Sequence, residues 1–229
     1  MTEFLKEVCL EFIVNPFACY RRLLSDRQQA RFWQQVQKMG GNIYVRPENI
    51  PGVFSIDLRS HVALQILEQG AYEKDVTDYM GKVLLDKPGV IVNVGANVGL
   101  MAVFLCKKFE RKTIAIEPNP EAYELLQKNI LLNAIDEQVS CVQACISAKE
   151  GQVDFSFVKG KPEYSSMGGI VHPCVNSEKK EMISVPAKPL NDVVNDEVAL
   201  IFSDTEGAEG LVLDGAQQII ERDHPVIMC

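Results

Sequence analysis

The run Gly89-Val-Ile-Val-Asn-Val-Gly95-Ala-Asn97-Val-Gly99 carries the strongest structural signal in this chain. Its first half is a compact apolar segment, which is typical of a strand buried on both faces. Its second half places Gly95, Asn97 and Gly99 behind that strand, and these residue types adopt left-handed backbone conformations most readily. Residues 100–109 continue with the apolar content of a helix. We therefore predict a strand, a tight turn and a helix.

The same alternation continues toward the C-terminus. Buried strands are predicted at residues 112–117, 139–146 and 198–203, and a last strand at residues 225–229. A helix is expected behind an Asn119 cap with Pro120 in its first turn, and another over residues 207–222. Residues 152–158 and 183–185 alternate and are expected to pair as a hairpin. Buried strands that alternate with helices predict an open, mostly parallel α/β sheet with helices on both faces.

The N-terminal part has a different pattern. Apolar residues recur at helical spacing within residues 2–13 and 26–36, and a Pro- and Gly-containing loop follows at residues 47–52. This loop is the expected boundary between a helical appendage, residues 1–48, and the main domain, residues 49–229. The main domain should begin with a short strand at residues 54–58 and a helical segment interrupted at Gly70.

Composition excludes several classes of protein. The chain has 229 residues, 47% of them hydrophobic, and 23 basic against 31 acidic residues give a net charge of −8. An acidic chain is a poor binder of phosphate backbones, so we expect no nucleic-acid partner. No apolar run reaches the roughly 20 residues of a membrane span. Seven scattered cysteines without a secretion signal favour reduced thiols and a cytoplasmic protein. The three histidines are far apart in the sequence, and we expect no metal site.

Glu117 ends the second predicted strand of the sheet, where ligands of such folds bind. A carboxylate there can accept hydrogen bonds from both hydroxyls of a ribose, and the alternative is a solvated carboxylate beside a helix cap. A ribose fits either a dinucleotide or S-adenosylmethionine. The G-x-G-x-x-G fingerprint of dinucleotide sites is broken here by Asn97 and Leu100, which disfavours a pyrophosphate. A nicotinamide-dependent oxidoreductase is therefore the weaker hypothesis.

The segment Ser203-Asp-Thr-Glu-Gly-Ala-Glu209 closes the strand at residues 198–203. Glu206 and Glu209 are also explained by the preference of helix N-termini for acidic residues. Asp204 lies on the carboxyl edge of the strand, beside the expected ligand crevice. Asp204 is our first candidate for a catalytic side chain that polarises or orients a substrate group, and Glu206 is the second. Ser165 and Ser166 lie in an expected Gly-rich loop, which either lines the acceptor pocket or is a plain connection.

In their order along the chain, these motifs resemble the FkbM family of S-adenosylmethionine-dependent methyltransferases, from about residue 55 to residue 229. The segments that carry the resemblance are Gly70-Ala-Tyr-Glu73, residues 90–99, Ile116-Glu-Pro-Asn-Pro120, residues 126–133, Asp204-Thr-Glu-Gly-Ala-Glu209, Leu213-Asp-Gly-Ala216 and His224-Pro-Val-Ile227. The resemblance implies a Rossmann-like class I methyltransferase sheet, an S-adenosylmethionine cofactor and, most often in the family, methylation of a hydroxyl on a sugar or another small molecule. We expect the adenine near Gln143 to Cys145, at the carboxyl end of the third strand. We expect cofactor contacts from Glu73, Asn93, Gly95, Ala96, Asn97, Gly99, Glu117, Pro118, Asn119, Gln143, Ala144 and Asp204.

Three residues depart from the family pattern: Asn93 and Asn191 stand where Asp is usual, and Phe202 stands where Lys is usual. They motivate an alternative function, a binding or scaffold protein that keeps the fold and has impaired catalysis.

The family sheet also has strands after the one that starts at Pro225. We therefore expect the final strands to be missing, as in a truncated product, and the acceptor pocket to be more open than usual. The remaining apolar edge would be covered by the N-terminal helices or by another chain, as in a homo-oligomer.

Overall fold

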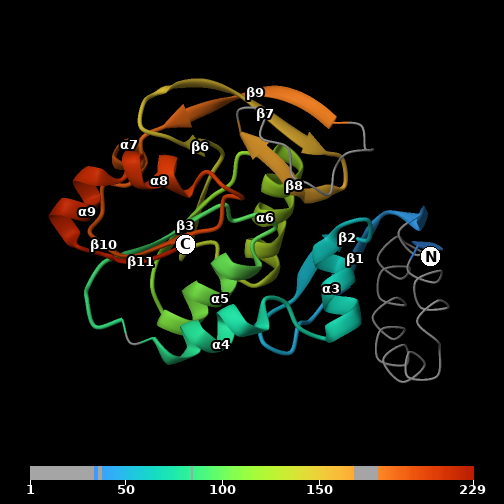
Figure 1. Ribbon diagram of the computed structural model, residues 1–229. Helices are drawn as coiled ribbons and strands as arrows, with labels where there is room; N and C mark the ends of the chain where they lie inside the picture. The colour runs from blue at the N-terminus through green and yellow to red at the C-terminus, as the bar shows by residue number, and fades with distance from the viewer. Residues whose placement is uncertain (1–33, 36–37, 84, 168–179) are drawn as a thin grey trace.

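The computed structural model describes residues 34–35, 38–83, 85–167 and 180–229 (Figure 1). The helices expected before residue 34 lie outside these ranges. The main sheet has five strands in the order β11-β10-β3-β4-β5, and every neighbouring pair is parallel. Their bounds are Val226–Met228, Val198–Ser203, Val90–Val94, Thr113–Ile116 and Val139–Val142. The expected parallel α/β sheet is confirmed, and β11 is its edge strand, with Val226 38% and Ile227 40% exposed.

Helices cover both faces of this sheet, as expected. Helices α5 (Leu100–Phe109) and α6 (Pro120–Leu132) pack on the face that includes Ile91. The other face includes Val92 and is covered by α7 (Leu190–Val193), α8 (Glu209–Gly215) and α9 (Gln217–Asp223). Successive residues of β3 therefore enter different cores, which explains why four of its five residues are apolar and only Asn93 is polar.

Two predicted elements are divided. The single helix expected at residues 207–222 is wrong, because the chain breaks it at Ala216 into α8 and α9. There Gly215 lies so close to the Ser147 carbonyl that a Cβ atom would collide with it. The strand expected at residues 139–146 is also two strands. β5 belongs to the main sheet, and β6 (Cys145–Ile146) joins a second, smaller sheet.

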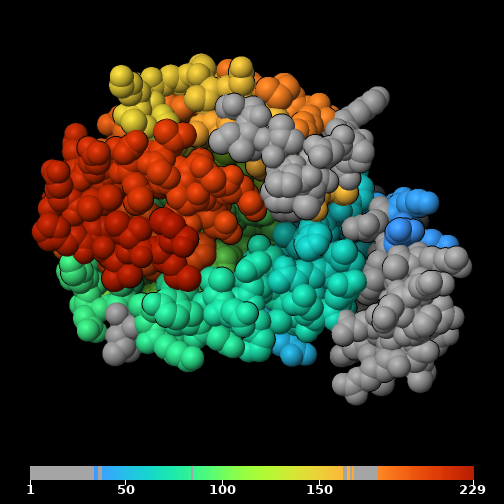
Figure 2. Space-filling model, viewed as in Figure 1, coloured from blue at the N-terminus to red at the C-terminus, as the bar shows by residue number. Residues whose placement is uncertain are grey.

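The smaller sheet has the order β6-β9-β7-β8 and includes β9 (Lys180–Lys188), β7 (Gly151–Val158) and β8 (Lys161–Met167). The predicted antiparallel pairing of residues 152–158 with residues 183–185 is confirmed. The loop expected around Ser165 is wrong, because these residues form β8 and pair with β7. In Figure 2 this sheet, in yellow and orange, packs across the red C-terminal helices, and the surface is hollowed between these helices and the blue-green N-terminal segments.

A hairpin and two helices precede the main sheet. Strand β1 (Asn42–Val45), which the sequence did not predict, pairs antiparallel with the expected β2 (Phe54–Asp57). Helices α3 (His61–Gln69) and α4 (Lys74–Lys82) follow, separated at Gly70 as predicted. The β1–β2 hairpin joins residues on both sides of the expected boundary at residue 48. No helix in the described ranges is both long and apolar enough to cross a bilayer.

A single buried amide ties these parts together. The side chain of Asn129 on α6 is fully buried. Its Oδ1 accepts the Ser55 N–H at 2.6 Å, and its Nδ2 donates to the carbonyls of Ser55 at 3.1 Å and Val98 at 2.7 Å. Asn129 thereby joins α6, β2 and the turn after β3.

Replacement of Asn129 by Ala should lower the free energy of unfolding by about 3 kcal/mol, because it leaves three buried backbone groups without a partner. Denaturant unfolding measures this loss. Asn133→Ala is the matched control, because Asn133 binds the N–H and carbonyl of Val53 in the same way but is only part-buried. Water can replace it there, so its loss should be about 1 kcal/mol. Equal losses would contradict the tethering role of Asn129.

Candidate active site

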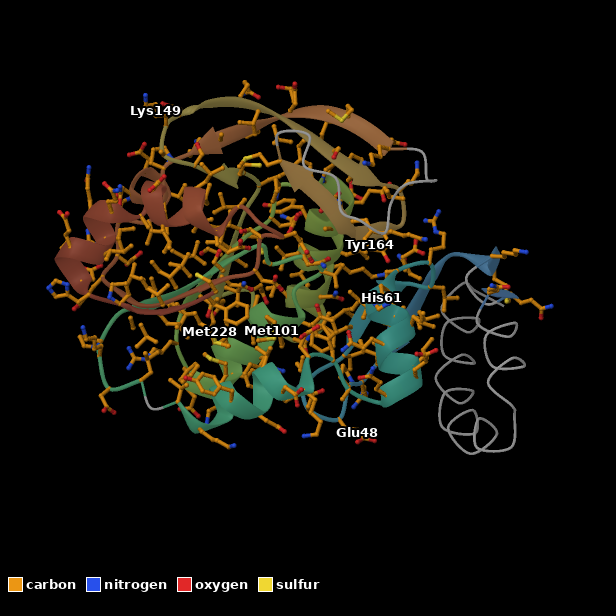
Figure 3. The ribbon with its side chains drawn as sticks, viewed as in Figure 1. Glu48, His61, Met101, Lys149, Tyr164 and Met228 are labelled. Atoms are coloured by element: carbon orange, nitrogen blue, oxygen red, sulfur yellow. The ribbon has the colours of Figure 1, made fainter. Side chains whose placement is uncertain are left out.

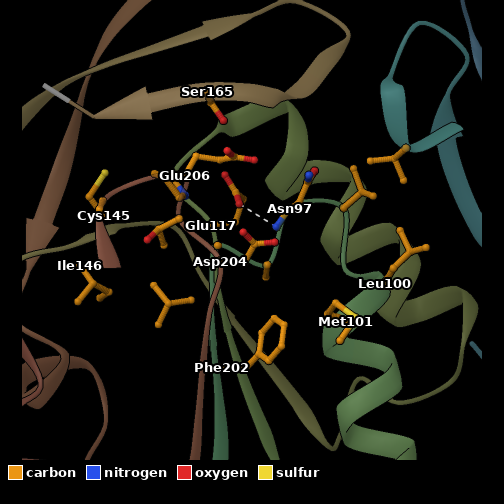
Figure 4. Close-up of a pocket in the computed structure, with 18 of the residues that line it drawn as sticks. Asn97, Leu100, Met101, Glu117, Cys145, Ile146, Ser165, Phe202, Asp204 and Glu206 are labelled. Carbon is orange, nitrogen blue, oxygen red and sulfur yellow. Dashed lines mark hydrogen bonds between the residues drawn. The ribbon is translucent and has the colours of Figure 1, made fainter. Parts of the chain in front are cut away.

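A cavity of about 360 Å³ opens at the carboxyl ends of the parallel strands. The strand ends contribute Gly95, Ala96, Asn97, Glu117, Ala144 and Asp204 to its wall (Figure 4). The volume falls within the range of small-molecule sites. The position agrees with the rule that open α/β sheets bind ligands where the strand order reverses, here between β3 and β10.

The turn after β3 is fixed by its neighbours on both sides. The N–H groups of Gly95 and Ala96 both donate to the Ile116 carbonyl on β4, at 3.0 and 2.9 Å. On the other side the Asp204 N–H donates to the Val94 carbonyl at 3.0 Å. Gly95 has φ of 77°, and a Cβ atom there would overlap the Asp204 carbonyl oxygen. Only glycine fits this position, so the floor of the cavity consists of backbone.

Glu117 lies at the centre of the site and is only 5% exposed. Its Oε2 accepts the Asn97 N–H and its Oε1 accepts the Asn119 N–H, both at 2.8 Å (Figure 4). Burial raises the pKa of Glu117 to about 7, although these two N–H groups favour the charged form. The alternative of a solvated carboxylate is therefore wrong. Each oxygen keeps lone pairs that can accept further hydrogen bonds from a ligand.

Other carboxylates line the same cavity: Glu73, Asp204 and Glu206. Burial raises the pKa of Asp204, and the charge of Glu209 adds to the effect. Burial and the charges of Asp204 and Asp75 raise the pKa of Glu73 in the same direction. No Lys or Arg occurs among the described residues of the cavity wall. The site therefore favours cationic or neutral ligands over anionic ones.

Backbone strain is concentrated at this cavity. The described residues include six non-glycine residues with positive φ, and three of them line it: Glu73 at 43°, Asn97 at 50° and Glu206 at 51°. Such conformations are costly, and they persist where the surrounding structure holds them for function.

Glu209 is a structural residue. Its Oε1 accepts hydrogen bonds from the Thr205 N–H and hydroxyl, both at 2.9 Å, and from the Gly207 N–H at 3.3 Å. Desolvation opposes ionisation, but these hydrogen bonds hold the pKa of Glu209 below its usual value. Glu209 thus shapes the turn that presents Asp204 and Glu206.

Of the predicted cofactor contacts, Glu73, Gly95, Ala96, Asn97, Glu117, Pro118, Ala144 and Asp204 line the cavity. The other four lie outside its wall, and their part in binding stays a prediction. Asn93 is fully buried, and no partner is recorded for its amide. Gly99 packs on Leu126, Asn119 caps α6 by accepting the Glu121 N–H at 3.0 Å, and Gln143 is exposed.

The sequence left most of the wall opposite the strand ends unpredicted. It named lining of the pocket by Ser165 as one of two alternatives, and Ser165 does line the cavity. Phe155 on β7 and Tyr164, Ser165 and Met167 on β8 line the cavity, as does His61 at the start of α3. His61 and Tyr164 lie near each other at the junction of α3 and β8 (Figure 3). The alternation of residues 152–158 was visible, but the Pro- and Ser-containing segment of β8 is typical of a loop. Across the described ranges, no group of three or more His, Cys, Asp or Glu side chains could hold a metal ion.

A parallel sheet with a glycine-containing turn after its central strand and a buried acid after the next strand is typical of Rossmann-like folds. The sequence profile of the Methyltransferase FkbM domain matches residues 93–229, more than half of the chain. The chain therefore belongs to the FkbM methyltransferase family, as its motifs indicated.

The chain is also similar to individual proteins. Methyltransferase sdnD of Sordaria araneosa is 26% identical over 200 residues, which cover 74% of this chain and 77% of that protein. The crystal structure of methyltransferase FkbM from Methylobacillus flagellatus KT aligns with a TM-score of 0.46 and 16% identity, over 68% of this chain and 35% of that one. This chain thus spans about a third of that protein. M. jannaschii TYW2 in complex with AdoMet aligns with a TM-score of 0.35 and 26% identity, over 44% of this chain and 42% of that one.

We expect Glu117 to titrate near pH 7 in the ligand-free protein, as carboxyl-carbon NMR would show. Its folded pKa lies above the usual 4.5, so the folded state binds the proton more tightly than the unfolded state. The free energy of unfolding should therefore fall, relative to that of Glu117→Gln, as the pH rises from about 4.5 through about 7. A difference that is constant across this window would contradict the buried, weakly acidic state of Glu117.

Proposed function

We propose that the protein transfers a methyl group from S-adenosylmethionine to a hydroxyl of a small-molecule acceptor. Membership of the FkbM family supports methyl transfer. The observation that carries the choice of donor is the buried Glu117 carboxylate, which faces a cavity whose described wall includes no Lys or Arg. A carboxylate in this position suits a ribose, and the acidic wall suits a sulfonium cofactor rather than a pyrophosphate.

The residues present fit this cofactor. The Asn97 Oδ1 atom is buried without a recorded partner, and Asn97 lines the cavity, so an acceptor is available to a ligand. When bound, S-adenosylmethionine supplies a methyl group that is already activated by its sulfonium. Glu117 would hold the ribose hydroxyls and Ala144 would lie beside the adenine. The carboxylates of Glu73 and Asp204 would face the positive charge of the methionine end.

In this proposal the chain itself aligns the acceptor and removes its proton. Asp204 accepts the proton of the acceptor hydroxyl, and its raised pKa brings it closer to the range in which a base works well. Glu206, on the same turn, is the second candidate for this role. The cavity walls hold the acceptor in line with the methyl group and exclude water, which would otherwise compete for the active groups.

The acidic wall also restricts which acceptor molecules can bind. Phosphorylated or carboxylated molecules would meet four carboxylates and no described Lys or Arg, so we propose a neutral acceptor such as a sugar or another small alcohol. Nucleic acid is excluded from this proposal for the same reason. A cytoplasmic location, and a homo-oligomer formed through the exposed β11 edge, remain part of the proposal.

One structural observation supports the alternative function, a binding protein with impaired catalysis. Asn93 carries no charge, and no hydrogen-bond partner is recorded for its amide. Cofactor binding without turnover on any alcohol of a broad panel would favour this alternative.

Removal of the Glu117 carboxylate should weaken S-adenosylmethionine binding by about 1–3 kcal/mol, the scale of a lost hydrogen bond to a charged group. Isothermal calorimetry with Glu117→Ala measures this change. Glu124→Ala is the matched control, because Glu124 is an exposed carboxylate of α6. Unchanged affinity in Glu117→Ala would refute the assignment of the ribose site.

Activity tests the proposed base. Incubation with S-adenosylmethionine and a panel of neutral alcohols should yield S-adenosylhomocysteine and a methylated product, both detected by mass spectrometry. Asp204→Asn should lower kcat about 10²–10⁴-fold, because general-base assistance is lost. Glu221→Gln, an exposed substitution on α9, serves as the control. Full activity of Asp204→Asn would show that another group takes the proton.

A further inference from the structure

The β7–β8 hairpin presents one face to the cavity. Phe155 and Met167 are directly opposite each other on the two strands, and both line the cavity together with Ser165. In Figure 4 the carboxylates of Glu117 and Asp204 lie between Ser165 and Phe202. The hairpin thus forms the side of the cavity that the strand ends do not supply.

The turn of this hairpin is held by a residue next to the proposed cofactor site. Val158 pairs with Lys161, so Lys159 and Gly160 form the turn. The Gly160 N–H donates to Oε2 of Glu121 at 2.8 Å. Glu121 lies in the first turn of α6, directly after the segment that binds the Glu117 carboxylate.

Arg59 holds the same turn from the other side. Its Nε and Nη2 donate to the two carboxylate oxygens of Asp57 at 2.9 and 2.6 Å, a bidentate pair that fixes the guanidinium plane. The guanidinium lies directly against Gly160, where a Cβ atom would overlap it. Gly160 also has φ of 73°, so glycine is required at this position for two reasons. We call Arg59, Glu121 and Gly160 the hairpin clamp.

We propose that the β7–β8 hairpin is the acceptor-recognition wall, that Phe155 and Met167 contact an apolar part of a neutral alcohol, and that the hairpin clamp positions this wall over the donor site. The inference rests on the proposed function for the identity of the site. Two observations support the wall independently of the identity of the donor. They are the apolar pair on the hairpin face and the contacts of the hairpin turn with α6 and with the residues after β2. Glu121 and Arg59 are positioning residues, because they do not line the cavity.

Saturation-transfer NMR with benzyl alcohol tests the wall directly, and benzyl phosphate is the matched anionic probe. Met167→Ala should weaken benzyl alcohol binding about tenfold through lost apolar contact. Met182→Ala should leave it unchanged, because Met182 lies on β9 of the same sheet, 58% exposed and away from the cavity. Benzyl phosphate should not bind. Failure of benzyl alcohol to bind, or equal binding by both variants, would overturn the proposal that the β7–β8 hairpin recognises the acceptor.

A pair of substitutions at one position tests the clamp. Glu121→Gln keeps a carbonyl oxygen for the Gly160 N–H, whereas Glu121→Ala removes it. We expect Glu121→Ala to weaken benzyl alcohol binding several-fold and to increase hydrogen exchange in residues 161–167, with Glu121→Gln close to the unaltered protein. Equal behaviour of the two variants would overturn the clamp. Calorimetry with S-adenosylmethionine on the same samples separates the two proposals. If S-adenosylmethionine does not bind, the proposed methyl donor is refuted, whereas the conclusion on benzyl alcohol binding to the hairpin is unaffected.

Discussion

The buried carboxylate of Glu117 is the interaction on which the site depends. Its two oxygens hold the backbone of Asn97 after β3 and of Asn119 after β4, so one side chain fixes both turns. This arrangement makes ionisation of Glu117 unfavourable, because the side chain is only 5% exposed and burial raises the pKa of Glu117 to about 7. In the ligand-free protein, ionisation of Glu117 opposes folding as the pH rises through this range. A ligand that donates two hydroxyl hydrogen bonds to Glu117 would offset this cost.

Much of this architecture follows from the sequence because buried parallel strands leave a simple pattern. The cores of β3, β4 and β10 are near-continuous apolar runs, since both faces of each strand are covered by helices. Helix starts are equally local. Asn119 and Pro120 begin α6 as predicted, and the helical segment before β3 is interrupted at Gly70. Glu117 and Asp204 could be placed in one site because the carboxyl ends of parallel strands meet at one edge.

The part of the cavity wall that the smaller sheet forms could not be predicted from such local patterns. Strand β8 exists because a two-residue turn brings it against β7, and its own composition is that of a loop. The break between β5 and β6 depends on the pairing of Cys145 with Ala187, far along the chain. Both features are long-range, and local propensity carries no information on them. The sequence therefore identified the proposed donor side, and on the proposed acceptor side it singled out only Ser165, as one of two alternatives.

Asn93 and Phe202 show how the structure changes the meaning of a sequence observation. Taken separately, each is a loss of a charge that is usual in the family, and two losses favour impaired catalysis. In the sheet the two residues are direct neighbours on β3 and β10, with Asn93 fully buried and Phe202 6% exposed. A charge on only one of them would be buried without its partner, which is strongly destabilising. A neutral residue at one position therefore requires a neutral residue at the other. The two departures therefore count as a single change of the sheet interior, next to the turn that carries Asp204.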